Sequence, residues 1–265
     1  MGIKLHEKDI KQELKFPREV QEEHYGVKLE QIQLILDSMQ YGKKTMFLCQ
    51  MTGLMRVGEL VQLRKKHVTD FGNNMMIKIP AGIVKFSKAR TTFWSKEASS
   101  RLRPHLKSMN DDDLIFQKNE NSQNAIIAVE QVLRRALCRV GLDQRYESTG
   151  RFMINTHSLR AYGITKLSRR DPNPAKKIAG HKGYLIEEYD RIDDDEKLAL
   201  YQKYEIDLLI DKDVIQKAEI RKLTEENKVK DKAIRDSERF SKITEITKLS
   251  PELLKQIIDE LKKSQ

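Results

Sequence analysis

Cysteine is scarce in this chain of 265 residues, which contains only Cys49 and Cys138. The two lie far apart within apolar helical patterns, so they indicate buried thiols of a reducing compartment rather than a disulfide or a pair of metal ligands. Long apolar runs are absent as well, and residues 1–17 are charged rather than signal-like. We therefore expect a cytoplasmic protein with no membrane partner.

Apolar residues make up only 38% of the chain and charged residues 34%, so a compact core must share the chain with solvated helices. The net charge of +10 is unevenly placed. Residues 205–265 contain 14 Lys and Arg against 14 Asp and Glu, so the whole excess lies in residues 1–204. A basic first part suggests a polyanionic partner and a neutral tail suggests a protein partner, although a well-charged surface alone gives the same composition.

Hydrophobic periodicity predicts a mainly α protein with a small antiparallel β-sheet, an α+β fold. Residues 1–26 read as a charged arm or linker, residues 27–204 as one domain, and residues 205–265 as a charged helical tail. Helices are predicted at 27–39, 45–51, 56–64, 95–107, 122–140, 157–167, 175–179 and 194–204, and strands at 75–79, 83–86 and 91–94.

The tail carries a thin apolar seam of Ile220, Leu223 and Ile234. This seam fits a short coiled coil or a solvated single helix equally well. Ser250 and Pro251 then predict the start of a final helix with an apolar stripe. A stripe with no local partner indicates docking in a groove of its own chain or of another copy.

An imidazole and a guanidinium stand three residues apart at His157 and Arg160. On a helix these side chains project from the same face. Asn155 and Thr156 stand where an N-cap would be, so the pair lies near unpaired backbone N–H groups and the positive end of the helix dipole. This is anion-binding geometry.

Further basic residues precede this segment. Arg56 starts a predicted helix beside a buried element, and Glu59, one turn on, could hold its guanidinium by a charge-assisted bond. Lys85, Lys88 and Arg90 lie on the predicted hairpin, from which they could reach along a phosphate backbone. Surface capping for Arg56, and lysines that blunt a sheet edge for the hairpin, are the structural alternatives.

These residues occur in a fixed order, followed by Gly180-His181 and Tyr189. The chain resembles the tyrosine recombinase, or phage integrase, family over residues 27–204. The resemblance rests on four motifs, which are Thr52-Gly53-Leu54-Met55-Arg56-Val57-Gly58-Glu59-Leu60, Lys85-x-x-Lys88-x-Arg90, His157-x-x-Arg160, and Gly180-His181 followed by Tyr189. The run 188–193 and the charged tail are also similar to those of archaeal and archaeal-virus integrases.

The resemblance implies site-specific cleavage and rejoining of DNA through a covalent 3′-phosphotyrosine intermediate, without a metal ion or another cofactor. The implied partner is double-stranded DNA, on which the protein would act as a homotetramer whose tail helix docks on a neighbouring subunit. Lys88 and Arg90 would contact the DNA. The implied catalytic residues are Arg56, Lys85, His157, Arg160, His181 and Tyr189.

The roles that the resemblance implies suit the chemistry of each side chain. Tyr189 would be the nucleophile, and Arg56 and Arg160 would hold the charge on the non-bridging oxygens through forked bonds. Lys85 would protonate the leaving 5′ oxygen, while the two histidines would assist proton transfer and bind the phosphate.

Residues 1–26 are too short to form the separate helical domain that members of the family usually have. Within its motifs, the chain departs from the family pattern in two places. One additional residue lies between Thr52-Gly53 and Arg56, and Tyr189 follows His181 by eight residues, one fewer than in many relatives. Other tyrosines compete for the role of nucleophile, namely Tyr184, Tyr201 and Tyr204. A non-catalytic DNA-binding or scaffolding relative and a type IB-like DNA topoisomerase are the alternative functions.

Overall fold

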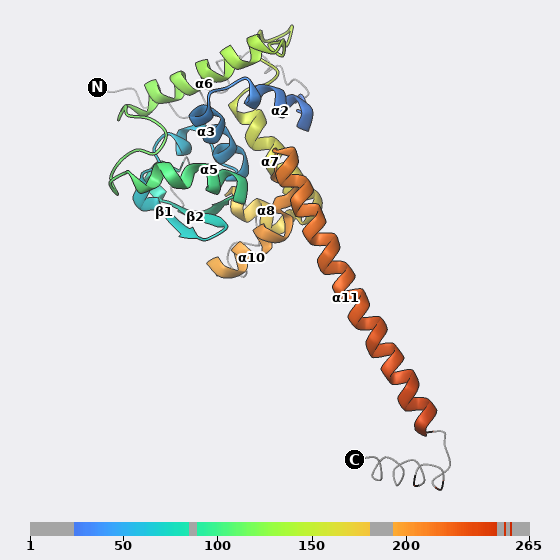
Figure 1. Ribbon diagram of the computed structural model, residues 1–265. Helices are drawn as coiled ribbons and strands as arrows, with labels where there is room; N and C mark the ends of the chain where they lie inside the picture. The colour runs from blue at the N-terminus through green and yellow to red at the C-terminus, as the bar shows by residue number, and fades with distance from the viewer. Residues whose placement is uncertain (1–23, 85–88, 181–192, 248–251, 253–254, 256–265) are drawn as a thin grey trace, which may run out of the picture. The chain divides into compact units, whose positions relative to one another are not determined.

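The computed structural model describes residues 24–84, 89–180 and 193–247, together with Glu252 and Lys255 (Figure 1). The chain divides into two compact units, Met1–Asp211 and Lys212–Gln265. Within the described ranges, no helix has the length and apolar character needed to cross a membrane.

The first unit is mainly helical and contains one three-stranded antiparallel sheet in the order β1-β2-β3. The predicted fold class is therefore confirmed. Its helices are α2 (Leu29–Asp37), α3 (Tyr41–Thr52), α4 (Val57–Leu60), α5 (Lys96–Lys107), α6 (Ser122–Arg139), α7 (Thr156–Arg170), α8 (Pro172–Ala179) and α10 (Asp194–Tyr204). Short 3₁₀ turns cover η1 (Lys65–His67), η2 (Ala81–Ile83) and η3 (Glu205–Leu208), and the strands are β1 (Val68–Phe71), β2 (Asn74–Ile79) and β3 (Arg90–Trp94).

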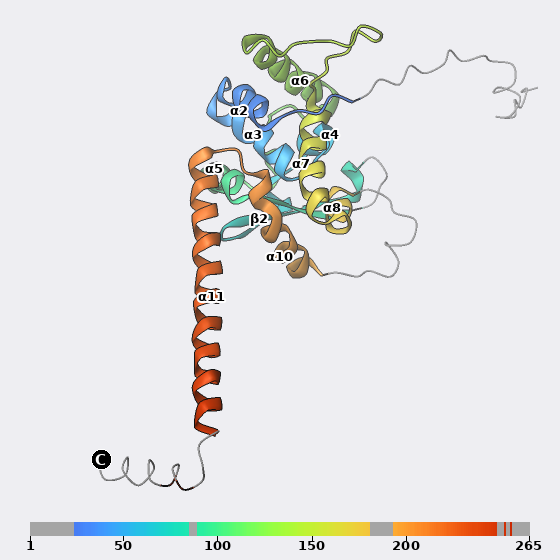
Figure 2. The same cartoon turned by 90° about the vertical axis from the view of Figure 1, so that its right-hand side faces the viewer.

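Helix α3 forms the centre of the core, because every residue from Thr45 to Thr52 is buried. Helix α7 packs against it and also lies beside α8 (Figure 2). The approach is close at Gly163, where a Cβ atom would lie 2.5 Å from the carbonyl oxygen of Met51. A glycine here lets α7 bring its first turns close to the loop that follows α3.

The sheet differs from the predicted hairpin. Strand β2 pairs directly with β3, so that Ile79 lies opposite Arg90, and residues 81–83 form a 3₁₀ turn instead of the predicted strand at 83–86. Residues 85–88 lie outside the described part of the chain. Strand β1 was not predicted because Thr69 to Phe71 are all exposed, which removes the apolar alternation that marks a strand.

Three further expectations need correction. Helix α4 ends at Leu60 instead of residue 64, because the carbonyl of Leu63 accepts a hydrogen bond from the backbone of Ile115 and the chain turns to meet that segment. Helix α3 begins at Tyr41, four residues before the predicted start at residue 45. Cys49 is buried as predicted, whereas Cys138 is exposed, because it lies on the outer face of α6.

Residues 205–211, which the sequence assigned to the tail, pack in the first unit. Leu208 and Ile210 are buried, and the carboxylate of Glu97 accepts hydrogen bonds from the backbone of Ile210 and Asp211 at 2.9 and 3.2 Å. The second unit contains α11 (Lys212–Thr247), a single helix of 36 residues. The apolar seam of the tail is 56% to 62% exposed on it, at Ile220, Leu223 and Ile234.

Candidate active site

One buried carboxylate lies among three arginines. Glu59 is 1% exposed, and its Oε2 atom lies 2.7 Å from Nη2 of Arg90 and 3.6 Å from Nη1 of Arg160. Its Oε1 atom accepts a hydrogen bond from Nη1 of Arg56 at 3.3 Å. Three guanidinium groups therefore share one negative charge, so this part of the protein has a local excess of positive charge.

Helix α4 fixes the first of these arginines. Arg56 is the N-cap of α4, and its backbone N–H donates to Oε2 of Glu59, the third residue of the helix, at 2.8 Å. A carboxylate at this position commonly accepts the N-cap N–H. The predicted bond between Glu59 and the guanidinium of Arg56 is confirmed, and the side chain of Arg56 remains 26% exposed.

The loop between α3 and α4 presents a carbonyl group to the other two arginines. Leu54 has φ = 50°, which is the only left-handed backbone conformation of a non-glycine residue among the described ranges. Its carbonyl oxygen accepts hydrogen bonds from Nη1 of Arg160 at 2.6 Å and from Nη2 of Arg90 at 3.2 Å. Leu54 lies in the segment that carries the additional residue before Arg56, and these bonds offset the backbone strain.

Arg160 is enclosed on all sides. Its side chain is 1% exposed, and Nη2 donates to the carbonyl of Ala179 at the end of α8 at 2.7 Å. Burial, followed by the neighbouring charges of Arg90 and Arg56, lowers the pKa of Arg160 to about 10. The guanidinium is therefore still charged at neutral pH, and an anion would relieve the repulsion between it and its neighbours.

His157 lies on the first turn of α7 and is partly exposed, whereas Arg160, one turn later, is buried. Partial burial, and then the charge of Arg160, lowers its pKa below the usual value. The expectation of unpaired N–H groups at this helix end was wrong. The side-chain oxygen of Asn155 already accepts the backbone N–H groups of His157 and Ser158, at 2.9 and 3.1 Å.

Arg90 lies in a different environment from the one expected. Its side chain is 6% exposed, and its guanidinium is directed to Glu59, Leu54 and the carbonyl of Ile178. The sequence placed it on a hairpin that reaches along DNA. In the structure it is the first residue of β3, and its side chain points into the molecule because the acceptors on α4 and α8 lie there.

Tyr201, one of the competing tyrosines, is a structural residue. It is 1% exposed, and its hydroxyl donates to the carbonyl of Thr52 at 3.0 Å. Burial raises its pKa well above the usual value. A phenol that is this hard to ionise and already bonded to the backbone is poorly suited to act as a nucleophile.

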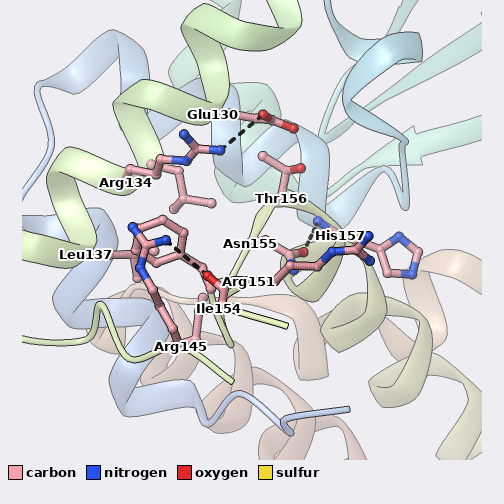
Figure 3. A pocket seen from close by; sticks show the side chains of 12 residues that line it. Glu130, Arg134, Leu137, Arg145, Arg151, Ile154, Asn155, Thr156 and His157 are labelled. Atoms are coloured by element: carbon pink, nitrogen blue, oxygen red, sulfur yellow. Dashed lines mark hydrogen bonds and ion pairs between the residues drawn. The ribbon is translucent and has the colours of Figure 1, made fainter. Parts of the chain in front are cut away.

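A cavity of about 440 Å³ opens beside His157 (Figure 3). Phe152 forms part of its wall, with the guanidinium carbons of Arg145 and Arg134 at 4.0 and 5.5 Å from the ring centre. Arg151 also lines it. Sequence reasoning missed these three arginines, although the basic loop at 145–151 before the His157 motif was a signal that could have found Arg145 and Arg151. Arg134 lies on α6.

Comparison with known proteins identifies the family. A model of the phage integrase family matches residues 27–186 of the chain. The chain belongs to the phage integrase family. None of the curated proteins compared with it shows a significant match.

Solved structures that resemble this chain are distant from it in sequence. The integrase from mycobacterium phage Brujita is 17% identical, with a TM-score of 0.51, and the match covers 72% of this chain and 60% of that one. Two structures of the XerH site-specific recombinase, a pre-cleavage complex with difH substrate and a post-cleavage complex with a palindromic difH substrate, are 20% and 19% identical. Their TM-scores are 0.44 and 0.45, and the matches cover 58% and 72% of this chain. This integrase-family chain spans 45% and 49% of the two XerH chains.

The remaining motif residues of the integrase-family chain lie outside the described ranges. These are Lys85, Lys88, His181 and Tyr189, together with the competitor Tyr184. Their roles, and those of Arg56, His157 and Arg160, stay predictions. Within the described ranges, no group of three or more His, Cys, Asp or Glu is placed to hold a metal ion.

Proposed function

We propose that the chain cleaves and rejoins double-stranded DNA at specific sites through a covalent 3′-phosphotyrosine intermediate. The observation that carries this proposal is the group of three arginines around Glu59, which has more positive than negative charge and is largely shielded from water. A phosphodiester that becomes pentacoordinate gains charge on its non-bridging oxygens, and preformed guanidinium donors stabilise that charge. Membership of the phage integrase family supports the same reading.

In the proposed reaction, the hydroxyl oxygen of Tyr189 attacks the phosphorus and the bond to the 5′ oxygen breaks. Arg56 and Arg160 bind the non-bridging oxygens, for which Arg160, at 1% exposure, must release the carbonyl of Leu54 or of Ala179. Lys85 gives a proton to the leaving 5′ oxygen, and His157 or His181 accepts the proton of the phenol. The phosphotyrosine conserves the bond energy, so attack by a 5′ hydroxyl of another strand reverses these steps and rejoins the DNA.

The lowered pKa of His157 suits this role, because an imidazole that is neutral at pH 7 can accept a proton. The cavity beside it would receive the DNA backbone next to the cleaved phosphate, with Arg134, Arg145 and Arg151 as phosphate contacts. The proposal includes a homotetramer on DNA, since exchange of strands between two duplexes requires a cleavage on each of four strands.

Trapping the intermediate tests the proposal. DNA that the full chain binds is first selected from a random duplex library. The selected site is then built into a substrate with a nick near the cleavage point, so that the short fragment carrying the 5′ hydroxyl dissociates after cleavage and religation is prevented. We expect wild-type protein and Tyr201→Phe to form a covalent protein–DNA adduct, and Tyr189→Phe to form none. Adducts at the wild-type level with Tyr189→Phe would show that another residue is the nucleophile.

Two outcomes would favour the alternative functions. Binding of the selected DNA by the wild type without any adduct indicates a DNA-binding or scaffolding relative. Relaxation of supercoiled plasmid by a monomer, without sequence preference, indicates a topoisomerase.

A further inference from the structure

The side chain of Arg90 joins segments that are far apart in the sequence. Its Nη2 atom donates to the carboxylate of Glu59 at 2.7 Å and to the carbonyl of Leu54 at 3.2 Å, on either side of Arg56 in the chain. Its Nη1 atom donates to the carbonyl of Ile178 near the end of α8. One guanidinium therefore ties the start of α4 to the end of α8.

Gly180 leaves room for this side chain. A Cβ atom at Gly180 would lie 2.5 Å from Cδ and 3.1 Å from Nε of Arg90, and Gly180 has φ = +67°. The first distance is shorter than real Cβ contacts, so any larger residue must displace Arg90 or the backbone at this point. Gly180 directly precedes His181 in the chain.

The backbone of Arg90 is fixed as well. It is the first residue of β3 and lies opposite Ile79 of β2. Lys85 lies five residues before it in the chain. Its side chain is 6% exposed, so a contact with the DNA backbone would require it to leave its three acceptors.

We propose that Arg90 is a positioning residue, which sets the separation between the start of α4, where Arg56 lies, and the end of α8. This inference rests on the proposed function, because it assigns Arg56 to a catalytic site. The fork of an arginine suits the task, since its Nη atoms reach a carboxylate and two carbonyls in fixed directions. A lysine has the same charge but a single nitrogen, which cannot serve acceptors that lie on both sides.

Two substitutions separate positioning from DNA contact. Arg90→Lys keeps the charge and Arg90→Gln removes it. We expect both to lower the rate of adduct formation at saturating DNA on the order of 100-fold, as misplacement of reacting groups does. The dissociation constant for DNA, measured without cleavage in the Tyr189→Phe background, should change by no more than about twofold, and its salt dependence should stay the same.

Gly180→Ala tests the contact from the other side without changing any charge. We expect it to lower the rate of adduct formation about tenfold or more in the wild type, and to have almost no further effect in Arg90→Gln, since the two changes disturb the same contact. Gly141→Ala is the matched control. Gly141 also has a positive φ, of +70°, but nothing lies within 4 Å of its Cβ position. Its replacement therefore measures only the effect of placing alanine at a positive φ, without a steric contact.

Several outcomes would overturn the inference. Arg90 does not position the site if Arg90→Lys forms the adduct at the wild-type rate, or if the effects of Gly180→Ala and Arg90→Gln are additive. The same conclusion follows if Arg90→Gln reduces the slope of log affinity against log salt by about 0.9, the value for one lost phosphate contact. If the wild type itself forms no adduct, the proposed function is wrong, and Arg90 then has no catalytic residues to position. Urea unfolding of each variant shows whether it folds, and if Arg90→Gln does not, Arg90→Lys and Gly180→Ala decide the question.

Discussion

Nη2 of Arg90 and Oε2 of Glu59 are 2.7 Å apart, and both side chains are almost completely buried. Strand β3 and helix α4 are thus joined by an ion pair that also contacts Arg56 and Arg160 through the same carboxylate. An isolated buried charge is costly, so each member of this group depends on the others.

Removal of the carboxylate should destabilise the fold. Glu59→Gln keeps the shape but leaves the buried guanidinium groups of Arg90 and Arg160 without their counter-charge, and we expect a loss of about 3–5 kcal/mol in the free energy of unfolding. Urea denaturation measures it. The matched control is Asp70→Asn, whose partner Arg103 lies 2.7 Å away on a partly exposed surface, and which should cost about 1 kcal/mol or less. Equal losses in the free energy of unfolding in the two variants would show that the buried arginines do not depend on the charge of Glu59.

The pH dependence of stability should contain a contribution from His157. Partial burial and the charge of Arg160 lower its pKa in the folded state, so the folded protein binds fewer protons here than the unfolded chain. Stability from this group is present above the unfolded pKa of about 6.5 and is lost as the pH falls through that value towards the folded pKa. His157→Gln should therefore lose less stability than the wild type between pH 7.5 and pH 5. An NMR titration of the His157 ring with a midpoint at or above the unfolded value would refute the expected shift.

The close approach of α7 to α3 can be tested by adding one methyl group. Gly163→Ala would place a Cβ atom 2.5 Å from the carbonyl oxygen of Met51, and we expect it to destabilise the protein by about 1–3 kcal/mol. Gly58→Ala is the control, because its Cβ atom would lie at an ordinary 3.6 Å from Ile126. That change should be neutral or stabilise by about 0.4–1 kcal/mol. Thermal unfolding of both variants compares them, and a Gly163→Ala protein as stable as the wild type would show that the helices can separate freely.

The cavity arginines should act through the DNA backbone. Arg145→Gln is expected to weaken DNA binding and to reduce the slope of log affinity against log salt by about 0.9, the value for one lost phosphate contact. Arg103→Gln removes the same charge from a side chain that is paired with Asp70, and it should leave the slope unchanged. Titrations of labelled duplex at several salt concentrations give both slopes. If Arg145→Gln and the wild type have equal slopes, Arg145 does not contact a DNA phosphate.

Sequence patterns were sufficient wherever local chemistry decides the structure. The N-cap role of Asn155, the helix that follows it and the bond between Glu59 and Arg56 depend on residues within one or two turns, and all were predicted. The buried α3 was equally clear, because eight consecutive residues of mostly apolar character leave little choice.

Expectations that depended on partners distant in the sequence failed. Arg90 looked like a surface residue because its acceptors, Glu59 and the carbonyl of Ile178, are 31 and 88 residues away. The end of α4 and the pairing of β2 with β3 depend in the same way on contacts that no local pattern shows. The left-handed conformation of Leu54 could not be expected from a leucine, which rarely adopts it.

The crowding of Arg56, Arg90 and Arg160 around one carboxylate also couples the stability of the fold to its ligand. While no phosphate is bound, the like charges oppose one another, and this repulsion is part of the free energy of the empty protein. Any anion that binds there stabilises the folded chain, by about 2.7 kcal/mol at a concentration 100 times its dissociation constant. Sulfate or phosphate should therefore raise the melting temperature more than chloride does at equal ionic strength. The protein in a dilute, anion-poor buffer lacks this stabilisation, and under the proposed function a phosphate of bound DNA would supply it.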